Sequence, residues 1–190
     1  EANGGEFRLG TPAQKVVIEN DKVKGIEAGG AFLPFDKVIS TIPLPYVPRV
    51  IPDLPTEILD AFRSVKNVAV VCIIAKLKKP VTENFWLNTN DPEMDIPGIV
   101  EYTNLRPLDH HVVYVPFYIP GEHPKYQEPD SEFIDKVKRY LMKINPELKP
   151  DDFLDVRASR YRFAQPICEP GYLDRLPSIQ LPVEGLLVAD

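Results

Sequence analysis

Hydrophobic and polar residues alternate in several short segments of the chain, and this period of two predicts β-strands. The densest series is QKVVIENDKVKGIEAGGAFLPFDKVISTIP, residues 14–43. An Asn-Asp pair at 20–21 and a Gly-Gly pair at 29–30 are typical of tight turns between strands. We therefore expect a small β-meander followed by a short apolar strand from Lys37 to Ser40. Pro43 should end this series, because proline has no amide donor and keeps the residue before it extended.

The rest of the chain mixes strand and helix patterns. The apolar, β-branched segment NVAVVCIIAKL, residues 67–77, predicts a central strand covered on both faces. Apolar residues three and four apart predict two helices, one capped by Thr56 and one capped by Asp130-Ser131 and ending at about Ile144. Shorter strands are expected at 85–87, 98–103, 110–118, 155–163 and 186–189, and a frayed edge strand around Phe7 and Leu9. The predicted fold class is α+β, with a mixed, mainly antiparallel sheet, helices on one face and the added meander.

Two segments resemble a known family. The meander and the strand DKVISTIP that follows it are similar to the middle of the flavin-containing amine oxidase and phytoene desaturase superfamily, which includes protoporphyrinogen oxidase. The tail RYRFAQPICEPGYLDRLPSIQLPVEGLLVAD, residues 160–190, is similar to the family's run into the last strand of its FAD domain. The resemblance implies a remnant of the FAD-binding domain at 1–43, a substrate-binding α+β domain at 44–182, and the start of the last FAD-domain strand at 183–190.

Composition narrows the functional classes. The net charge of −6 and the pI near 5.2 argue against nonspecific binding to nucleic acid or to anionic membranes, which require basic surfaces. The longest wholly apolar run, residues 68–75, is far shorter than the ~20 residues of a transmembrane helix. No metal site is expected, because the two cysteines lack a metal-binding spacing and the adjacent His110 and His111 would point to opposite faces of a strand. We expect a cytoplasmic location, with peripheral attachment to a membrane as the alternative.

The chain has no initiating Met, no signal peptide and no GxGxxG dinucleotide fingerprint. We therefore expect a piece of a longer protein whose main partner is the missing FAD-binding domain of the same chain. By resemblance, the whole protein is an FAD-dependent oxidoreductase that transfers hydride from an apolar or amine-type small-molecule substrate to flavin. The isolated piece should be inactive and should not retain FAD. The resemblance implies that the cofactor-binding residues are Ala13, Thr41, Pro43, Ala189 and Asp190.

Candidate substrate-binding residues come from strand positions. Tyr114 and Tyr118 share a face by parity, as do Arg160 and Arg162. Aromatic rings can wall a cavity for an apolar substrate, although they also pack within ordinary sheets. Two guanidinium groups on one face could bind a carboxylate or pyrophosphate, although they could equally lie on a solvated face. Gln165 is added because the resemblance implies that its loop approaches the flavin from the substrate side. The set of substrate-binding candidates is Tyr102, Tyr114, Tyr118, Arg160, Arg162 and Gln165, and no catalytic residue is indicated.

Three other functions are compatible with the sequence. A flavin-dependent mutase of the UDP-galactopyranose mutase type would use Arg160 and Arg162 on the diphosphate of a sugar nucleotide. A non-enzymatic α+β binding module would need no cofactor. A degenerate paralogue would keep the fold without catalysis.

Overall fold

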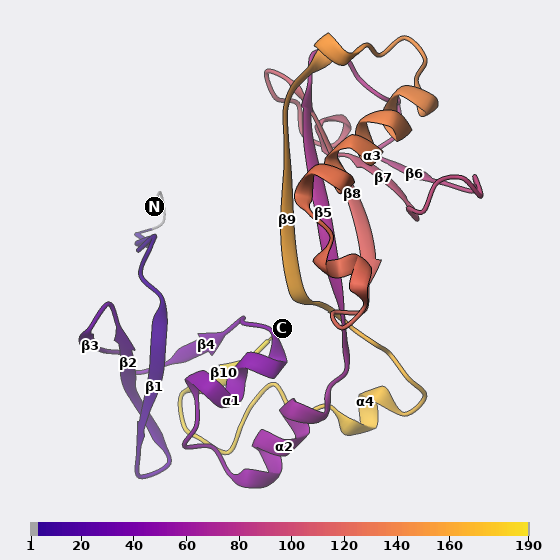
Figure 1. Cartoon of the computed structure of the whole chain (residues 1–190). Helices are drawn as coiled ribbons and strands as arrows, with labels where there is room; N and C mark the ends of the chain where they lie inside the picture. Colours follow the sequence, from indigo (N-terminus) through magenta and orange to yellow (C-terminus); the bar gives the residue numbers. More distant parts are fainter. Residues whose placement is uncertain (1–3, 190) are drawn as a thin grey trace. The chain divides into compact units, whose positions relative to one another are not determined.

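The structure is a computed structural model that describes residues 4–189 (Figure 1). The chain divides into two compact units. The first combines the described parts of 1–66 and 167–190, and the second is Asn67–Pro166. Residues 44–66 and 167–182 thus pack in the first unit. The division by function, with boundaries at 43/44 and 182/183, stays a prediction.

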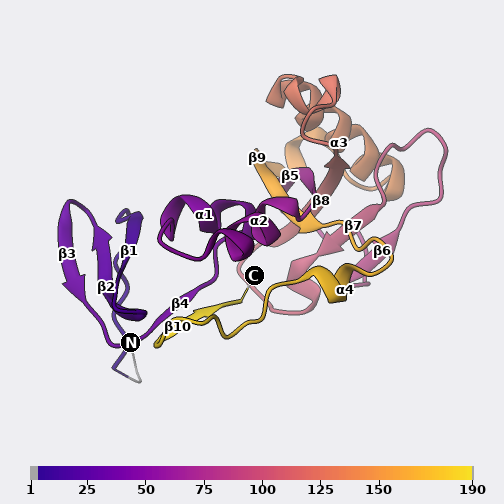
Figure 2. The ribbon, with the colours of Figure 1, turned by 90° about the horizontal axis from the view of Figure 1, so that it is seen from below.

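The first unit contains the expected β-meander. Strands β1 (Ala13–Glu19), β2 (Lys22–Ala28) and β3 (Ala31–Pro34) form an antiparallel sheet in chain order. Asn20 and Asp21 have φ angles of 52° and 55°, which fits a two-residue hairpin turn with both central residues left-handed. Strand β4 (Val38–Ser40) pairs in parallel with β10 (Leu186–Val188), so the end of the chain returns to the meander's own unit (Figure 2).

Short helices complete the first unit. They are η1 (Leu44–Tyr46), α1 (Val47–Val50), α2 (Thr56–Ser64) and α4 (Tyr172–Arg175). The core joins both chain segments, because the buried side chains of Val16, Phe62, Val183 and Leu186 belong to one hydrophobic cluster.

Two local predictions in the first unit are wrong. Thr56 is the first residue of α2 rather than its cap, and Pro55 occupies the cap position without a side-chain hydrogen bond. The segment around Phe7 and Leu9 forms no strand, and both side chains are exposed. Alternation over only a few residues is a weak strand signal when no neighbouring strand is available to pair.

The second unit is an antiparallel sheet with the order β6-β7-β8-β5-β9. The strands are β5 (Asn67–Leu77), β6 (Trp86–Asn88), β7 (Gly98–Glu101), β8 (His111–Ile119) and β9 (Phe153–Pro166). The helices are α3 (Asp130–Ile144) and the one-turn segments η2 (Tyr102–Asn104), η3 (Pro124–Gln127) and η4 (Pro150–Asp152). The predicted α+β fold class and the central position of β5 are confirmed.

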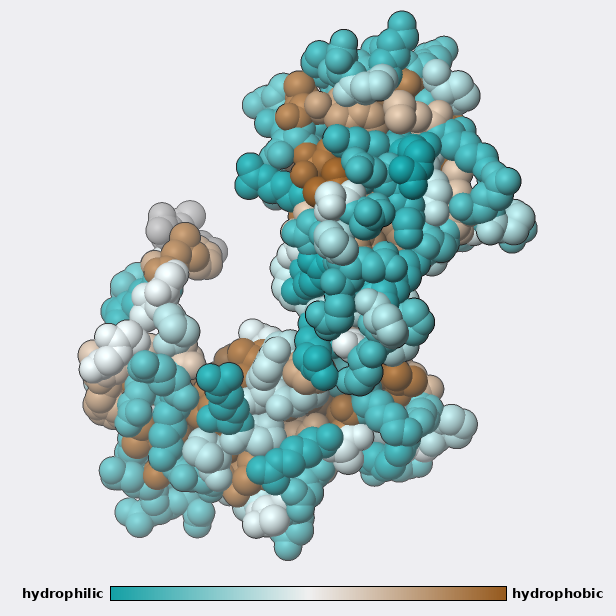
Figure 3. Space-filling model, in the orientation of Figure 1, coloured by the Kyte–Doolittle hydropathy of each residue, from teal (hydrophilic) through white to brown (hydrophobic). Residues whose placement is uncertain are grey.

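Helix α3 covers one face of this sheet. Phe133, Val137 and Leu141 are fully buried in one cluster with the β5 residues Val71 and Ile73. Hydrophilic residues dominate the visible outer surface over α3 (Figure 3). On the reverse face of β5, Cys72 and Ile74 are only partly buried and Lys76 is exposed. The expectation that β5 is covered on both faces is therefore wrong, because the unit has a helical layer on one side alone.

Candidate functional site

The sheet face of the second unit that points away from α3 carries most of the predicted aromatic residues. Strand register places Tyr114 beside Ile74, and Tyr118 beside Val70. Val71 and Ile73, which lie between these β5 residues, face α3, so Tyr114 and Tyr118 share the opposite face, as predicted. We call this surface the open sheet face; its members include Trp86, Val100, Tyr114, Pro116, Tyr118, Val70, Cys72, Ile74, Arg157, Ser159 and Tyr161, of which Pro116 is buried.

Cross-strand rows organise the open sheet face. One row runs Trp86–Val100–Tyr114–Ile74–Arg157 across all five strands, and another runs Tyr118–Val70–Tyr161. Trp86 and Tyr118 are each 47% exposed and Tyr161 is 60% exposed. Large aromatic side chains are normally among the better-buried residues of a domain, so these three exposed rings distinguish this face from the side that α3 covers.

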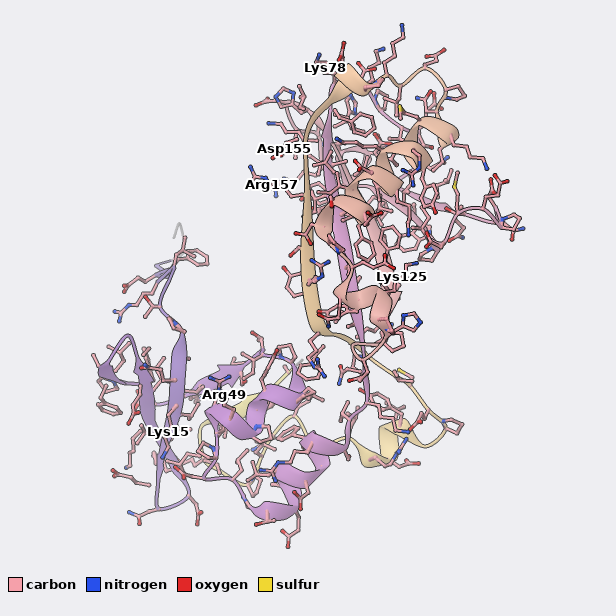
Figure 4. All side chains as sticks on the ribbon, in the orientation of Figure 1. Lys15, Arg49, Lys78, Lys125, Asp155 and Arg157 are labelled. Atoms are coloured by element: carbon pink, nitrogen blue, oxygen red, sulfur yellow. The ribbon has the colours of Figure 1, made fainter. Side chains whose placement is uncertain are left out.

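Neighbouring groups fix two positions on this surface. Tyr102, in η2, meets Tyr114 edge to face with ring centroids 5.9 Å apart. At the far end of β9, the Arg157 Nε donates a hydrogen bond of 2.7 Å to Asp155, and both side chains project away from α3 (Figure 4). The open sheet face is thus mainly aromatic and aliphatic, with one exposed ion pair at its β9 edge.

The three remaining substrate-binding candidates lie on β9. Arg160 is beside Val71, on the side covered by α3. Its guanidinium donates to the carbonyl oxygens of Tyr126 and Glu128 at 3.2 and 2.6 Å and pairs with Asp130. These contacts give Arg160 a structural role at the start of α3.

Arg162 and Gln165 follow an irregularity in the strand. The pairing of β5 with β9 shifts register between Val68 and Val70, so alternation no longer fixes which side Arg162 occupies. Arg162 donates a hydrogen bond of 3.0 Å to Glu122. Gln165 is exposed beside Val68 at the strand end. Substrate binding by Arg160, Arg162 and Gln165 stays a prediction.

Two predicted cofactor residues come together in the first unit. Ala13 and Pro43, thirty residues apart in sequence, line one groove of about 500 Å³. Its complete lining is Pro12, Ala13, Gln14, Ile42, Pro43, Tyr46, Arg49 and Val50. Strand β1 forms one wall, and as an edge strand it has a row of backbone groups without ladder partners. The groove is therefore apolar along its walls, with polar backbone at one side and a single cationic side chain.

The other predicted cofactor residues lie at the end of the β4–β10 pair. Thr41 is exposed directly after β4, and the Ala189 amide donates a hydrogen bond of 2.9 Å to the carbonyl oxygen of Ser40. Asp190 lies outside the described residues. Cofactor binding by this set stays a prediction.

One buried carboxylate, that of Glu101, was not among the residues predicted to be functional. Glu101 is fully buried and accepts hydrogen bonds from the amides of Val81 and Thr82, the shortest being 2.7 Å. Burial raises the pKa of Glu101, although these hydrogen bonds lower it and partly offset the effect. The Nδ1 atom of His111 lies 3.6 Å from this carboxylate. A single glutamate in the apolar strand GIVE was the available signal, and its contacts indicate an anchor for the loop at 81–82.

The described part of the chain contains no group of three or more His, Cys, Asp or Glu side chains arranged to hold a metal ion. Within the same residues, no helix is both long enough and apolar enough to cross a membrane.

Solved structures share this fold. An oxidoreductase from Methanosarcina mazei matches 99% of this chain at 22% identity with a TM-score of 0.66. Putrescine oxidase bound to putrescine matches 99% of this chain at 16% identity, with a TM-score of 0.66. Reduced UDP-galactopyranose mutase matches 89% of this chain at 16% identity, with a TM-score of 0.60. The chain covers 45%, 44% and 38% of those proteins respectively, which is less than half of each. No match is found among curated proteins.

These likenesses show that the chain shares its fold with part of each of these proteins. The family is fixed by a second comparison, in which the model of the flavin containing amine oxidoreductases matches residues 1–190. The chain belongs to this family, whose members use FAD.

Proposed function

We propose that this chain supplies the substrate-binding sheet, and part of the cofactor-binding surface, of an oxidoreductase that moves hydride from an apolar or amine-type substrate to FAD. The observation that carries the proposal is the open sheet face. Its exposed aromatic residues lie on the side of the sheet that α3 leaves uncovered. Such a surface can pack against a substrate and exclude water from it.

The groove of the first unit fits part of the cofactor. Its apolar walls suit a flat heterocycle, and the edge of β1 at Ala13 offers backbone hydrogen-bonding groups. Ala13 and Pro43 would contact the cofactor there. Thr41 precedes Pro43 by two residues, and the Ala189 amide is hydrogen bonded to the Ser40 carbonyl oxygen next to Thr41. When bound, FAD supplies the two-electron acceptor of the reaction. The sequence has no glycine-rich phosphate-binding turn, so the groove by itself should hold FAD weakly.

The side chains of the open sheet face bind and orient rather than react. Tyr118 and Tyr161 flank Val70, so a substrate can contact two rings and an aliphatic side chain together. Aromatic faces attract both hydrocarbon and ammonium groups, which keeps apolar and amine substrates equally compatible. Arg160 and Arg162, on which a mutase would depend, are engaged by protein oxygens. Their geometry lends the mutase alternative no support.

The test uses the full-length protein. We expect it to purify with the visible spectrum of a bound flavin, and the flavin to bleach when a substrate of the correct class is added without oxygen. Tyr118→Ala and Tyr161→Ala should slow this bleaching at least tenfold at subsaturating substrate. Phe32→Leu, which changes a 52% exposed aromatic residue of the meander, is the matched control and should leave the rate unchanged. A colourless protein that takes up no FAD would support the binding-module alternative instead.

A further inference from the structure

We propose that Arg49 is a further cofactor-binding residue, whose guanidinium packs against the adenine ring of FAD at the rim of the first unit's groove. This inference rests on the proposed function, because it requires that the whole protein bind FAD. It assigns a role to a residue that no pattern in the sequence singled out.

The position of Arg49 is fixed by the packing of α1. Val47 and Ile51, four residues apart, are fully buried, and the Ile51 amide donates a hydrogen bond of 2.8 Å to the Val47 carbonyl oxygen. Residues four apart share a helix face, and a residue midway between them lies on the opposite face. Arg49 is therefore exposed on the outer side of α1, where it lines the groove (Figure 4).

Charge distinguishes Arg49 from its neighbours. Within residues 4–189, no hydrogen bond or ion pair involves its guanidinium. Nearby cations are paired, since the Lys15 Nζ lies 2.7 Å from Asp53 and the Arg63 guanidinium 2.8 Å from Asp60. Among the described residues, Arg49 is also the only charged side chain that lines the groove. Its planar cation is thus available to a ligand without breaking an existing contact.

The chemistry of the groove favours a purine base. Pro12, Ile42, Pro43 and Val50 offer apolar contacts, and Tyr46 adds an aromatic ring at the same rim as Arg49. A guanidinium stacks readily on a flat π-system, and the adenine edge can hydrogen bond to the backbone of an edge strand. The volume of about 500 Å³ lies within the range of small-molecule sites. Ala13, which the resemblance implies as a cofactor-binding residue, lines the same groove as Arg49.

The experiment measures ligand affinity in the full-length apoprotein. FAD, ADP and FMN are each titrated against wild type, Arg49→Ala, Arg49→Lys and the control Arg63→Ala, an exposed arginine of the same unit outside the groove. We expect Arg49→Ala to weaken FAD and ADP binding by about 5–30-fold, in line with one cation–π contact. FMN, which lacks adenine, should bind all four proteins equally. Arg49→Lys keeps the positive charge but loses the planar guanidinium group, so it should also weaken FAD binding.

Three results would overturn the inference. FAD affinity of Arg49→Ala within twofold of wild type would remove Arg49 from the site while leaving the proposed function intact. An equal loss of FMN affinity in Arg49→Ala would mean that Arg49 contacts a part of the cofactor other than adenine. Wild-type protein that binds neither flavin would overturn the proposed function itself. Thermal melting of every variant checks folding, and the exposed position of Arg49 predicts unchanged melting temperatures.

Discussion

The rings of Tyr102 and Tyr114 meet edge to face, with centroids 5.9 Å apart and planes at 89°. The contact ties the η2 turn to the middle of β8 and leaves Tyr114 half-buried on the open sheet face. Tyr118, on the same face, is 47% exposed. The two tyrosines of β8 therefore differ, because the Tyr114 ring packs against Tyr102 while almost half of the Tyr118 side chain is exposed.

The ring contact should be measurable in the free energy of unfolding. A double-mutant cycle of Tyr102→Leu and Tyr114→Leu, by denaturant unfolding of this chain, should give a coupling of about 0.5–1.5 kcal/mol. Tyr102→Leu with Tyr118→Leu is the control cycle and should give additive effects. Additivity in the first cycle as well would show that the edge-to-face contact contributes nothing.

The acidic limb of the pH–stability curve should depend on Asp95. Burial tends to raise the pKa of Asp95, but hydrogen bonds from Lys125 and Tyr140 and the charges of Lys125 and Lys136 lower it to about 2. A lowered folded-state pKa means that this stabilisation is complete above the ordinary pKa of 3.8 and is lost as the pH falls through about 2.

Unfolding curves of wild type and Asp95→Asn between pH 2 and 6 test this. The wild-type advantage should be constant above pH 5 and should shrink steadily toward pH 2. A wild-type advantage that stays constant down to pH 2 would contradict the role of Asp95.

A close backbone contact makes Gly185 irreplaceable at the start of β10. Its φ is 84°, and a Cβ atom there would lie 2.4 Å from the carbonyl oxygen of Asp36. Gly30 also has a positive φ, 79°, but open space around the Cβ position. Both alanine variants incur the left-handed backbone cost of about 1 kcal/mol, and only Gly185→Ala adds a clash.

Gly185→Ala should therefore be less stable than Gly30→Ala by at least about 1 kcal/mol in chemical denaturation. The loss should be accompanied by faster amide exchange at Val38, whose N–H donates to the Gly185 carbonyl oxygen at 2.8 Å. Equal stability of the two variants would show that β4 and β10 can separate without cost.

Local sequence signals predicted the elements well. The meander was predictable because the turn pairs at 20–21 and 29–30 act over a few residues, and β5 because its apolar composition suits only a central strand. The division of the chain into two units was harder to predict from the sequence, because it depends on contacts between residues that are distant in the sequence. The hydrogen bond from the Ile167 amide to the Lys66 carbonyl oxygen joins the two segments of the first unit.

The candidate site was likewise predictable only in part. Parity placed Tyr114 and Tyr118 on one face, but parity cannot tell which face a helix will cover, so it could not foresee that Arg160 lies under α3. Resemblance pointed to Ala13 and Pro43, and the groove brings them together. Arg49 escaped notice because its position depends on the packing of α1, which no local pattern specifies.

Arg160 provides a test that separates a structural role from a ligand-binding one. Its guanidinium donates to the carbonyl oxygens of Tyr126 and Glu128, pairs with Asp130 and lies 5.6 Å from the Phe133 ring centroid. Arg160→Met should lower the free energy of unfolding by about 1–3 kcal/mol, because the partly buried carbonyl oxygens lose their donors.

Arg157→Met is the matched control for this change. Arg157 lies on the same strand and pairs with Asp155, but its side chain is 80% exposed, so its loss should cost at most about 0.5 kcal/mol. In the full-length enzyme at a temperature where both variants are folded, a structural Arg160 leaves KM unchanged. A rise in KM for Arg160→Met without loss of stability would instead support the substrate-binding role predicted from the sequence.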